Sequence, residues 1–214
     1  MMARPFDLSL YLVTDVELAG PRGVVETVRA AIEGGVTLVQ LRDPYGKGQR
    51  QVETAAALLE FLRPRGIPLI INDRVDVALA VDADGVHVGQ SDIPAAMVRR
   101  LIGPDRILGL SVSFAHELAA PDLADVDYLG VGPIYATPTK TNAAPPIGFD
   151  GVAALAAAAP VPVVAIGGVK AEHVDRILAA GAAGMAVVSA IMAAADPAAA
   201  AADFSARISR FRQG

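Results

Sequence analysis

The chain contains no cysteine, and this absence removes several kinds of site at once. Disulfide bonds, thiolate nucleophiles and zinc or iron–sulfur centres built on cysteine are all excluded. Three histidines occur, and they do not have the spacing of zinc ligands. We therefore expect no transition-metal chemistry.

The chain also lacks a basic cluster and a long apolar run. Its net charge is −5, and a nucleic-acid surface needs grouped lysine and arginine, so no nucleic-acid partner is expected. No apolar run approaches the roughly 18 to 20 residues of a membrane span, and residues 1–7 do not resemble a signal peptide. We expect a cytoplasmic protein with no membrane partner, and a homo-oligomer is compatible with the sequence.

What the chain does have is a regular alternation of apolar runs and helical patterns. Hydrophobic residues make up 53% of its 214 residues, and no shift in composition marks a second domain. Eight short β-rich runs cover residues 8–14, 37–42, 68–72, 85–88, 107–111, 128–131, 161–166 and 184–188. Helical spacing separates most of them. Units of about 27 residues predict a single-domain α/β fold over residues 1–214, a (β/α)8 TIM barrel, with a doubly wound open sheet as the alternative.

Polar residues gather where these strands end, which is where the active sites of barrels lie. They are Gln40, Arg42, Asn72, Asp73, Gln90, Asp92, Ser111, Thr137, Thr139, Lys140 and Ser189. Gln40 and Arg42 are two positions apart on a strand and so point to the same side. An arginine there either binds an anion or pairs with a carboxylate such as Asp73.

Two loops have the composition of phosphate sites. Residues 131–141 end a strand in a proline-stiffened loop with three threonines and Lys140, one of three lysines in the chain. Hydroxyl and ammonium groups suit a phosphate, and the alternative is an ordinary surface turn. Gly167 and Gly168 follow the seventh strand, where barrels often hold phosphate on backbone N–H groups, although a Gly-Gly pair by itself usually marks a turn.

The acidic residues and the histidines allow more than one interpretation. Asp73 and Asp92 end neighbouring strands, so their carboxylates could share Mg²⁺, or both could be helix N-caps. His87 lies within a strand and is expected to point into the barrel as a core histidine rather than a base. His116 and His173 are expected on helices, facing solvent.

Read in order, the motifs of the chain are similar to those of the thiamine-phosphate synthase family. They are Tyr11-Leu12-Val13-Thr14-Asp15, Val39-Gln40-Leu41-Arg42-Asp43, Ile71-Asn72-Asp73-Arg74, Gly85-Val86-His87-Val88-Gly89-Gln90, Gly109-Leu110-Ser111, Gly132-Pro133-Ile134 with Thr137-x-Thr139-Lys140, Pro145-Pro146-Ile147-Gly148 and Ile166-Gly167-Gly168-Val169. The resemblance covers essentially the whole chain and implies a transferase of thiamine biosynthesis. Such an enzyme joins a pyrimidine methyl diphosphate to a hydroxyethylthiazole phosphate and releases diphosphate, with Mg²⁺ as cofactor.

The resemblance also implies roles for individual residues. The pyrimidine diphosphate would be held by Gln40, Arg42, Asn72, Ser111 and Lys140, of which Arg42, Ser111 and Lys140 are the catalytic candidates. The thiazole phosphate would be held by Thr137, Thr139, Gly168, Val188 and Ser189. Asp73 and Asp92 would bind Mg²⁺, and the family's route is dissociative, so diphosphate leaves before the thiazole nitrogen attacks.

One position departs from the family pattern. Pro44 stands where the family commonly has a lysine, and Lys47 or Arg74 is a candidate to replace the missing diphosphate contact. A thiazole tautomerase is the nearest alternative, but it typically lacks the paired aspartates and the loop lysine present here. A ligand-binding barrel without turnover is the other alternative, and Pro44 is its best support. We expect activity to be retained, because the other charged residues are in place.

Overall fold

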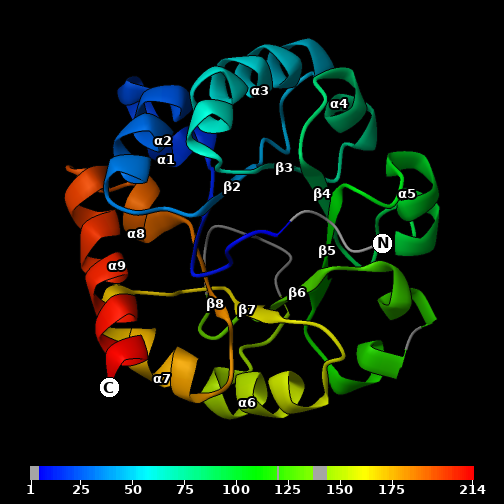
Figure 1. Ribbon diagram of the computed structural model, residues 1–214, viewed down its shortest axis with the longest axis vertical. Coiled ribbons are helices and arrows are strands. Elements are labelled where there is room, and N and C mark those ends of the chain that lie inside the picture. Colours follow the sequence, from blue (N-terminus) through cyan, green and yellow to red (C-terminus); the bar gives the residue numbers. More distant parts are fainter. Residues whose placement is uncertain (1–4, 120, 137–143) are drawn as a thin grey trace.

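The computed structural model describes residues 5–119, 121–136 and 144–214. Within these residues, eight parallel strands close into a barrel in sequence order, with helices around them (Figure 1). The strands are β1 Leu10–Val13, β2 Leu38–Leu41, β3 Leu69–Asn72, β4 Gly85–Val88, β5 Ile107–Val112, β6 Tyr128–Val131, β7 Val163–Ala165 and β8 Gly184–Val187. Because β1 pairs with both β2 and β8, the sheet has no open edge, and the predicted (β/α)8 barrel is confirmed.

Helices cover the outside of the barrel. The α-helices are α1 Val16–Ala19, α2 Val24–Glu33, α3 Gly48–Leu62, α4 Val75–Ala80, α5 Ala95–Ile102, α6 Gly148–Ala158, α7 Val174–Ala179, α8 Ser189–Met192 and α9 Pro197–Gln213. The 3-10 helices are η1 Gly20–Arg22, η2 Arg63–Arg65, η3 Ala115–Ala119, η4 Pro121–Asp125 and η5 Ala171–His173. The described part of the connection from β5 to β6 holds η3 and η4, where the other connections carry an α-helix. None of the helices described is both long enough and apolar enough to cross a bilayer.

The strands are buried on both faces, as expected for parallel strands covered by helices. In β1, Leu10 and Leu12 pack in the outer layer of the core, whereas Tyr11 and Val13 belong to a separate interior cluster. That cluster also contains Leu8, Leu38, Ile70, Ile107, Tyr128, Val164 and Ala186. Side chains of alternate residues therefore fill the barrel, and the polar site lies above a packed floor.

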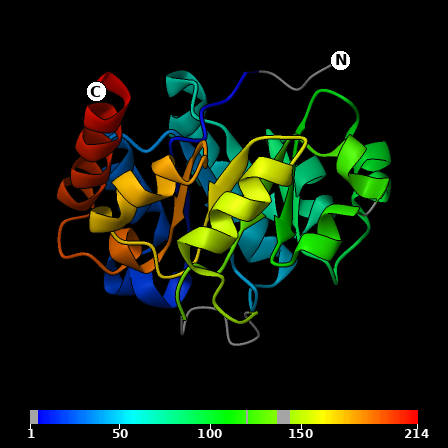
Figure 2. The ribbon, with the colours of Figure 1, turned by 90° about the horizontal axis from the view of Figure 1, so that it is seen from below.

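Helix α9 is the last element of the chain and closes the ring of helices beside α2. It packs against α2 and α7 on the outside of the barrel (Figures 1 and 2). Asp196 caps it by accepting a hydrogen bond of 3.0 Å from the Ala199 N–H, and Pro197 is its first residue. A Cβ atom at Gly34, where α2 ends, would lie 2.3 Å from the Ala198 carbonyl oxygen, so glycine permits this close approach.

Candidate active site

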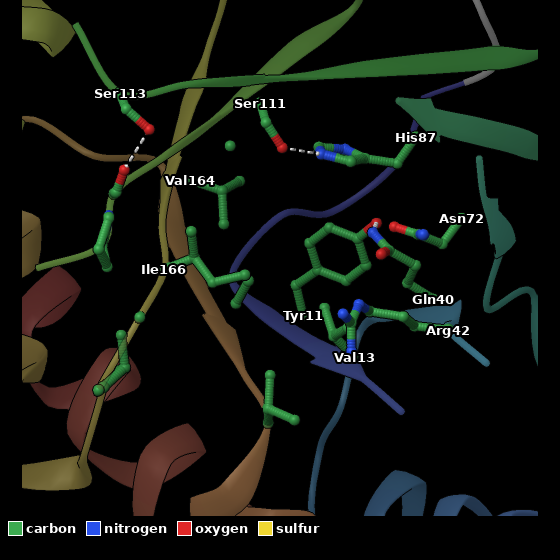
Figure 3. Close-up of a pocket in the computed structure, with 18 of the residues that line it drawn as sticks. Tyr11, Val13, Gln40, Arg42, Asn72, His87, Ser111, Ser113, Val164 and Ile166 are labelled. Carbon is green, nitrogen blue, oxygen red and sulfur yellow. Dashed lines mark hydrogen bonds between the residues drawn. The ribbon is translucent and has the colours of Figure 1, made fainter. Parts of the chain in front are cut away.

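A cavity lies at the carboxyl ends of the barrel strands (Figure 3). Its polar side chains are Gln40, Arg42, Asn72, His87, Ser111, Ser113 and Ser189. Gly130, Gly132, Gly167, Gly168 and Val188 also line it. Barrel closure thus brings together residues from β2, β3, β5, β7 and β8 that the sequence suggested for the two substrates.

The other expected site residues are placed differently. Asp73 follows β3 and Asp92 lies beyond β4, and neither lines the cavity wall formed by the described residues. Thr137, Thr139 and Lys140 lie outside the described residues. Their roles therefore stay predictions.

Arg42 points into the cavity from the end of β2 (Figure 3). Within the described residues it forms no ion pair, so the alternative pairing with Asp73 is not what the structure shows. Its backbone is held by Thr14, which accepts a hydrogen bond of 2.9 Å from the Arg42 N–H and donates one of 3.2 Å to the Arg42 carbonyl. A half-buried guanidinium that has no carboxylate partner in the described part of the chain is suited to an anionic ligand.

A chain of hydrogen bonds crosses the barrel interior at the cavity wall, and four of its five residues, all except Tyr128, line the cavity. The Gln40 amide donates to the Tyr11 hydroxyl over 2.6 Å, and this hydroxyl lies 2.8 Å from that of Tyr128. The Tyr128 hydroxyl lies 2.8 Å from His87 Nδ1, and His87 Nε2 lies 2.9 Å from the Ser111 hydroxyl. The prediction that His87 points into the barrel is confirmed, and the chain connects it to two expected substrate contacts.

No role could be assigned from the sequence to Tyr11 or Tyr128, the two tyrosines of this hydrogen-bonded chain, because both lie within apolar strands. Burial raises the pKa of Tyr11 and of Tyr128, so both keep their phenolic protons. Glycines make room for the rings: a Cβ atom at Gly109 would lie 2.2 Å from Tyr128 Cζ, and one at Gly130 would lie 3.1 Å from His87 Cε1. The glycines of β5 and β6 were the signal available in the sequence, because a glycine within an apolar strand often marks the close approach of another residue.

Asp73 has a strained backbone and does not cap a helix. Its φ is 60°, a left-handed conformation that residues other than glycine rarely adopt. Helix α4 begins after Arg74, without a side-chain capping bond. The Asp73 carboxylate accepts a hydrogen bond of 2.6 Å from the Asn72 amide, and its N–H donates to the His87 carbonyl over 2.9 Å. The end of β3 therefore holds this carboxylate in a fixed place beside β4.

Asp92 is also not a helix cap. Helix α5 begins after Pro94, with no side-chain capping bond, and the exposed Asp92 carboxylate accepts a hydrogen bond of 2.8 Å from the Gly89 N–H. This bond closes a tight turn directly after β4. The capping alternative is thus wrong for both aspartates.

The loops after β6 and β7 pack closely together. Gly167 and Gly168 have φ values of 93° and 68°, which favour glycine. A Cβ atom on Gly167 would lie 2.4 Å from Pro133 Cβ, and one on Gly168 would lie 2.7 Å from Tyr135 Cβ. Glycine therefore keeps the backbone of this loop at the cavity wall, where N–H groups can reach a ligand.

Comparison with known proteins identifies the family. A family model described as thiamine monophosphate synthase matches residues 10–191. The thiamine-phosphate synthase of Azorhizobium caulinodans is 57% identical over 195 residues, which cover 91% of this chain and 92% of that protein. The chain belongs to the thiamine-phosphate synthase family.

Other relatives agree with this assignment. The thiamine-phosphate synthase of Xanthobacter autotrophicus is 56% identical over 196 residues, covering 92% of this chain and 93% of that protein. The structure of a thiamine phosphate pyrophosphorylase from Pyrococcus furiosus superposes with a TM-score of 0.86 at 35% identity, covering 95% of this chain and 96% of that one. The chain is thus a thiamine-phosphate synthase, a transferase of thiamine biosynthesis.

The donor set of this synthase fits Mg²⁺. Among the described residues no group of three or more His, Cys, Asp or Glu side chains gathers as a metal cage. Mg²⁺ does not need one, since it commonly takes one or two carboxylates and completes its shell with water and substrate phosphate. Asp73 and Asp92 offer such hard oxygen ligands at the ends of adjacent strands, and neither carboxylate caps a helix.

The loop that carries Pro44 is tied to helix α3. Asp43 is buried and forms a two-pronged ion pair with Arg50, with N–O distances of 2.9 and 2.7 Å. Arg74 is paired with Asp76, which raises its pKa, so this arginine is already engaged at the surface. Lys47 is exposed immediately before α3, and it is the more accessible replacement for the lysine that the family commonly has at position 44.

The two other histidines differ in their surroundings. His116 is exposed on η3, as expected. His173 is half-buried, and its ring centre lies 4.9 Å from that of Tyr135 and 5.9 Å from that of Phe149. The expectation that His173 faces solvent therefore holds only in part, because aromatic rings from two other segments pack against it, and burial lowers its pKa.

Proposed function

We propose that the cavity binds a pyrimidine methyl diphosphate beside a thiazole phosphate and joins them. The bond between the methylene carbon and the diphosphate oxygen breaks, and diphosphate leaves with the electron pair. The thiazole nitrogen then forms the new bond to the methylene carbon, which gives thiamine phosphate. The observation that carries this proposal is the arrangement of the cavity. Gln40, Arg42, Asn72 and Ser111 lie in or directly after β2, β3 and β5, whereas Gly168 follows β7, and Val188 and Ser189 follow β8.

The two sides of the cavity suit different parts of the reaction. Arg42 supplies a fixed positive charge toward a departing diphosphate, and we assign Lys140 the same task. Gln40 and Ser111 provide polar groups for the edge of the pyrimidine ring. The glycine loop and Ser189 are assigned to the thiazole phosphate, whose oxygens accept backbone and hydroxyl hydrogen bonds.

We assign Asp73 and Asp92 to Mg²⁺. When bound, this ion supplies positive charge that stabilises the departing diphosphate. A dissociative order follows from the substrate, because the ring amino group can donate electrons to the methylene carbon once diphosphate has gone. The chain's own task is then to hold the two rings at a productive distance.

Release of diphosphate by the purified protein tests the function. With Mg²⁺ and both substrates, we expect one diphosphate and one thiamine phosphate per turnover, measured by a coupled diphosphate assay and by mass spectrometry. Omission of the thiazole phosphate is the control. If the folded protein gives no product under these conditions, the proposed reaction is wrong.

The same assay separates the alternative functions. A thiazole tautomerase would convert its thiazole without pyrimidine or Mg²⁺, and a barrel without turnover would bind ligands unchanged. The relatives named above are synthases, which favours turnover despite Pro44. A cytoplasmic location and a single domain over residues 1–214 stay predictions from the sequence.

A further inference from the structure

The hydrogen-bonded chain from Gln40 to Ser111 has a direction. The Gln40 Nε2 group carries hydrogens and can only donate, so the Tyr11 oxygen accepts from it over 2.6 Å. Tyr11 is fully buried and keeps its own proton, which also needs an acceptor. Among the described residues that acceptor is the Tyr128 oxygen, 2.8 Å away. The opposite direction would leave a buried hydroxyl hydrogen without a partner.

The same reasoning continues through Tyr128 and His87. The Tyr128 oxygen accepts from Tyr11, so the hydrogen of Tyr128 points to His87 Nδ1, 2.8 Å away. An imidazole nitrogen that accepts a hydrogen bond carries no proton. The hydrogen of a neutral His87 ring therefore sits on Nε2, which donates to the Ser111 hydroxyl over 2.9 Å.

The direction of the chain fixes what its two ends present to the cavity. Ser111 accepts from His87, and its own hydrogen has no acceptor among the described residues, so it is available to a ligand as a donor. Gln40 turns its Nε2 group toward Tyr11, so its amide oxygen points away and is available as an acceptor. Figure 3 shows Gln40 beside Tyr11, and Ser111 bonded to His87.

We propose that Tyr11, Tyr128 and His87 are positioning residues that set Ser111 as a hydrogen-bond donor and Gln40 as an acceptor. A matching ligand has an unprotonated ring nitrogen that accepts from Ser111 and an amino group that donates to Gln40. An aminopyrimidine bound in one orientation has both groups. The inference rests on the proposed function, because it deepens how the same cavity selects the pyrimidine substrate. A purely structural role does not require these buried hydrogen bonds, because apolar side chains can fill the interior of a barrel without buried polar groups.

Tyr128→Phe tests the selection, because it keeps the ring that packs against Gly109 and removes the hydroxyl that links Tyr11 to His87. His87 Nδ1 then loses its donor, and the direction of the Ser111 hydroxyl is no longer set. We expect the Kd for the pyrimidine methyl diphosphate to rise about tenfold. The Kd values for inorganic diphosphate and for thiazole phosphate, measured by the same calorimetry, should stay within twofold.

Ile107→Val is the matched control. Ile107 belongs to the same interior cluster as Tyr128. The change removes one buried methylene and alters no residue of the hydrogen-bonded chain from Gln40 to Ser111. We expect all three Kd values to stay within twofold of the parent. The inference is overturned if Tyr128→Phe binds the pyrimidine as tightly as the parent does, or if both variants weaken all three ligands alike.

Nitrogen-15 NMR of the histidine rings provides a test that needs no substrate. The chain has three histidines, so His116→Asn and His173→Asn assign the signals of His87 by subtraction. We expect the hydrogen on Nε2 in the parent and a population shift toward Nδ1 in Tyr128→Phe. A hydrogen on Nδ1 of the parent refutes the direction of the chain. If the folded parent carries the hydrogen on Nε2 but does not bind the pyrimidine methyl diphosphate, the direction of the chain stands and the proposed substrate is refuted.

Discussion

Thr14 is the residue whose replacement most directly tests how the barrel positions Arg42. It is fully buried, and its hydroxyl both accepts from the Arg42 N–H at 2.9 Å and donates to the Arg42 carbonyl at 3.2 Å. Thr14→Val keeps the shape of the side chain and removes both bonds. The backbone N–H of Thr14 still donates to the Gln40 carbonyl over 2.9 Å, so the strand itself stays paired.

The expected loss of stability follows from the Arg42 N–H, which the substitution leaves without its partner. An unsatisfied buried donor costs about 1–3 kcal/mol, and the weaker bond to the carbonyl adds to this, so we expect the free energy of unfolding to fall by about 2 kcal/mol. For a chain of this length that corresponds to a decrease of roughly 4–8 °C in Tm. Because the Arg42 backbone is then less restrained, the Kd for inorganic diphosphate should also rise severalfold.

Thr27→Val is the matched control for this measurement. Thr27 is equally buried and donates its hydroxyl to the Gly23 carbonyl over 2.8 Å, but that carbonyl also accepts from the Thr27 N–H at 3.2 Å. Its replacement leaves no backbone N–H without a partner, so a loss below about 1 kcal/mol is expected. Urea unfolding of the parent, Thr14→Val and Thr27→Val measures these losses in the free energy of unfolding. Equal stability losses in the two variants would refute the argument that Thr14 satisfies the Arg42 backbone.

Three further predictions concern charge and protonation. Lys140→Ala should lower kcat on the order of 100-fold or more with Tm unchanged, because the lysine is assigned to the transition state; unchanged turnover would remove it from the mechanism. Asp73→Asn should raise the Mg²⁺ concentration needed for half-maximal rate on the order of 10–100-fold, whereas Asp76→Asn, at an exposed carboxylate in the first turn of α4, should not. If Asp73→Asn needs the same Mg²⁺ concentration as the parent, Asp73 is not a ligand. Burial raises the pKa of Tyr11 and Tyr128, so their contribution to stability is complete below the ordinary tyrosine pKa near 10 and is lost as the pH rises above it. Urea unfolding at pH 8 and pH 11 should show this loss, and it should be smaller in Tyr128→Phe; a stability independent of pH in the parent would contradict it.

The elements of the barrel could be predicted because their signals are local. The runs at 85–88 and 128–131 coincide with β4 and β6, and the other strands were predicted to within a few residues. Each strand is a short, mostly apolar run, and the alternation of these strands with helices predicts a parallel sheet. Polar residues at strand ends then gave Gln40, Arg42, Asn72 and Ser111, because barrels place their sites there.

The position of His173 and the roles of Tyr11, Tyr128 and Thr14 could not be predicted in this way. His173 belongs to a helical pattern that faces solvent locally, but the packing of Tyr135 and Phe149 against it depends on other elements. The two tyrosines are read from the sequence as apolar strand residues. Nothing near either of them in the sequence indicates a polar partner.

The sequence by itself determined the barrel, the family and the set of polar residues at its carboxyl end, because hydrophobic periodicity and short motifs are written along the chain. Only the tertiary structure decided which of those residues face one cavity, that neither aspartate caps a helix, and that two tyrosines join Gln40 to His87. The physical reason is closure of the barrel. It places hydroxyl groups 117 positions apart within 2.8 Å of each other, and a contact of that sequence separation leaves no periodic trace in the chain.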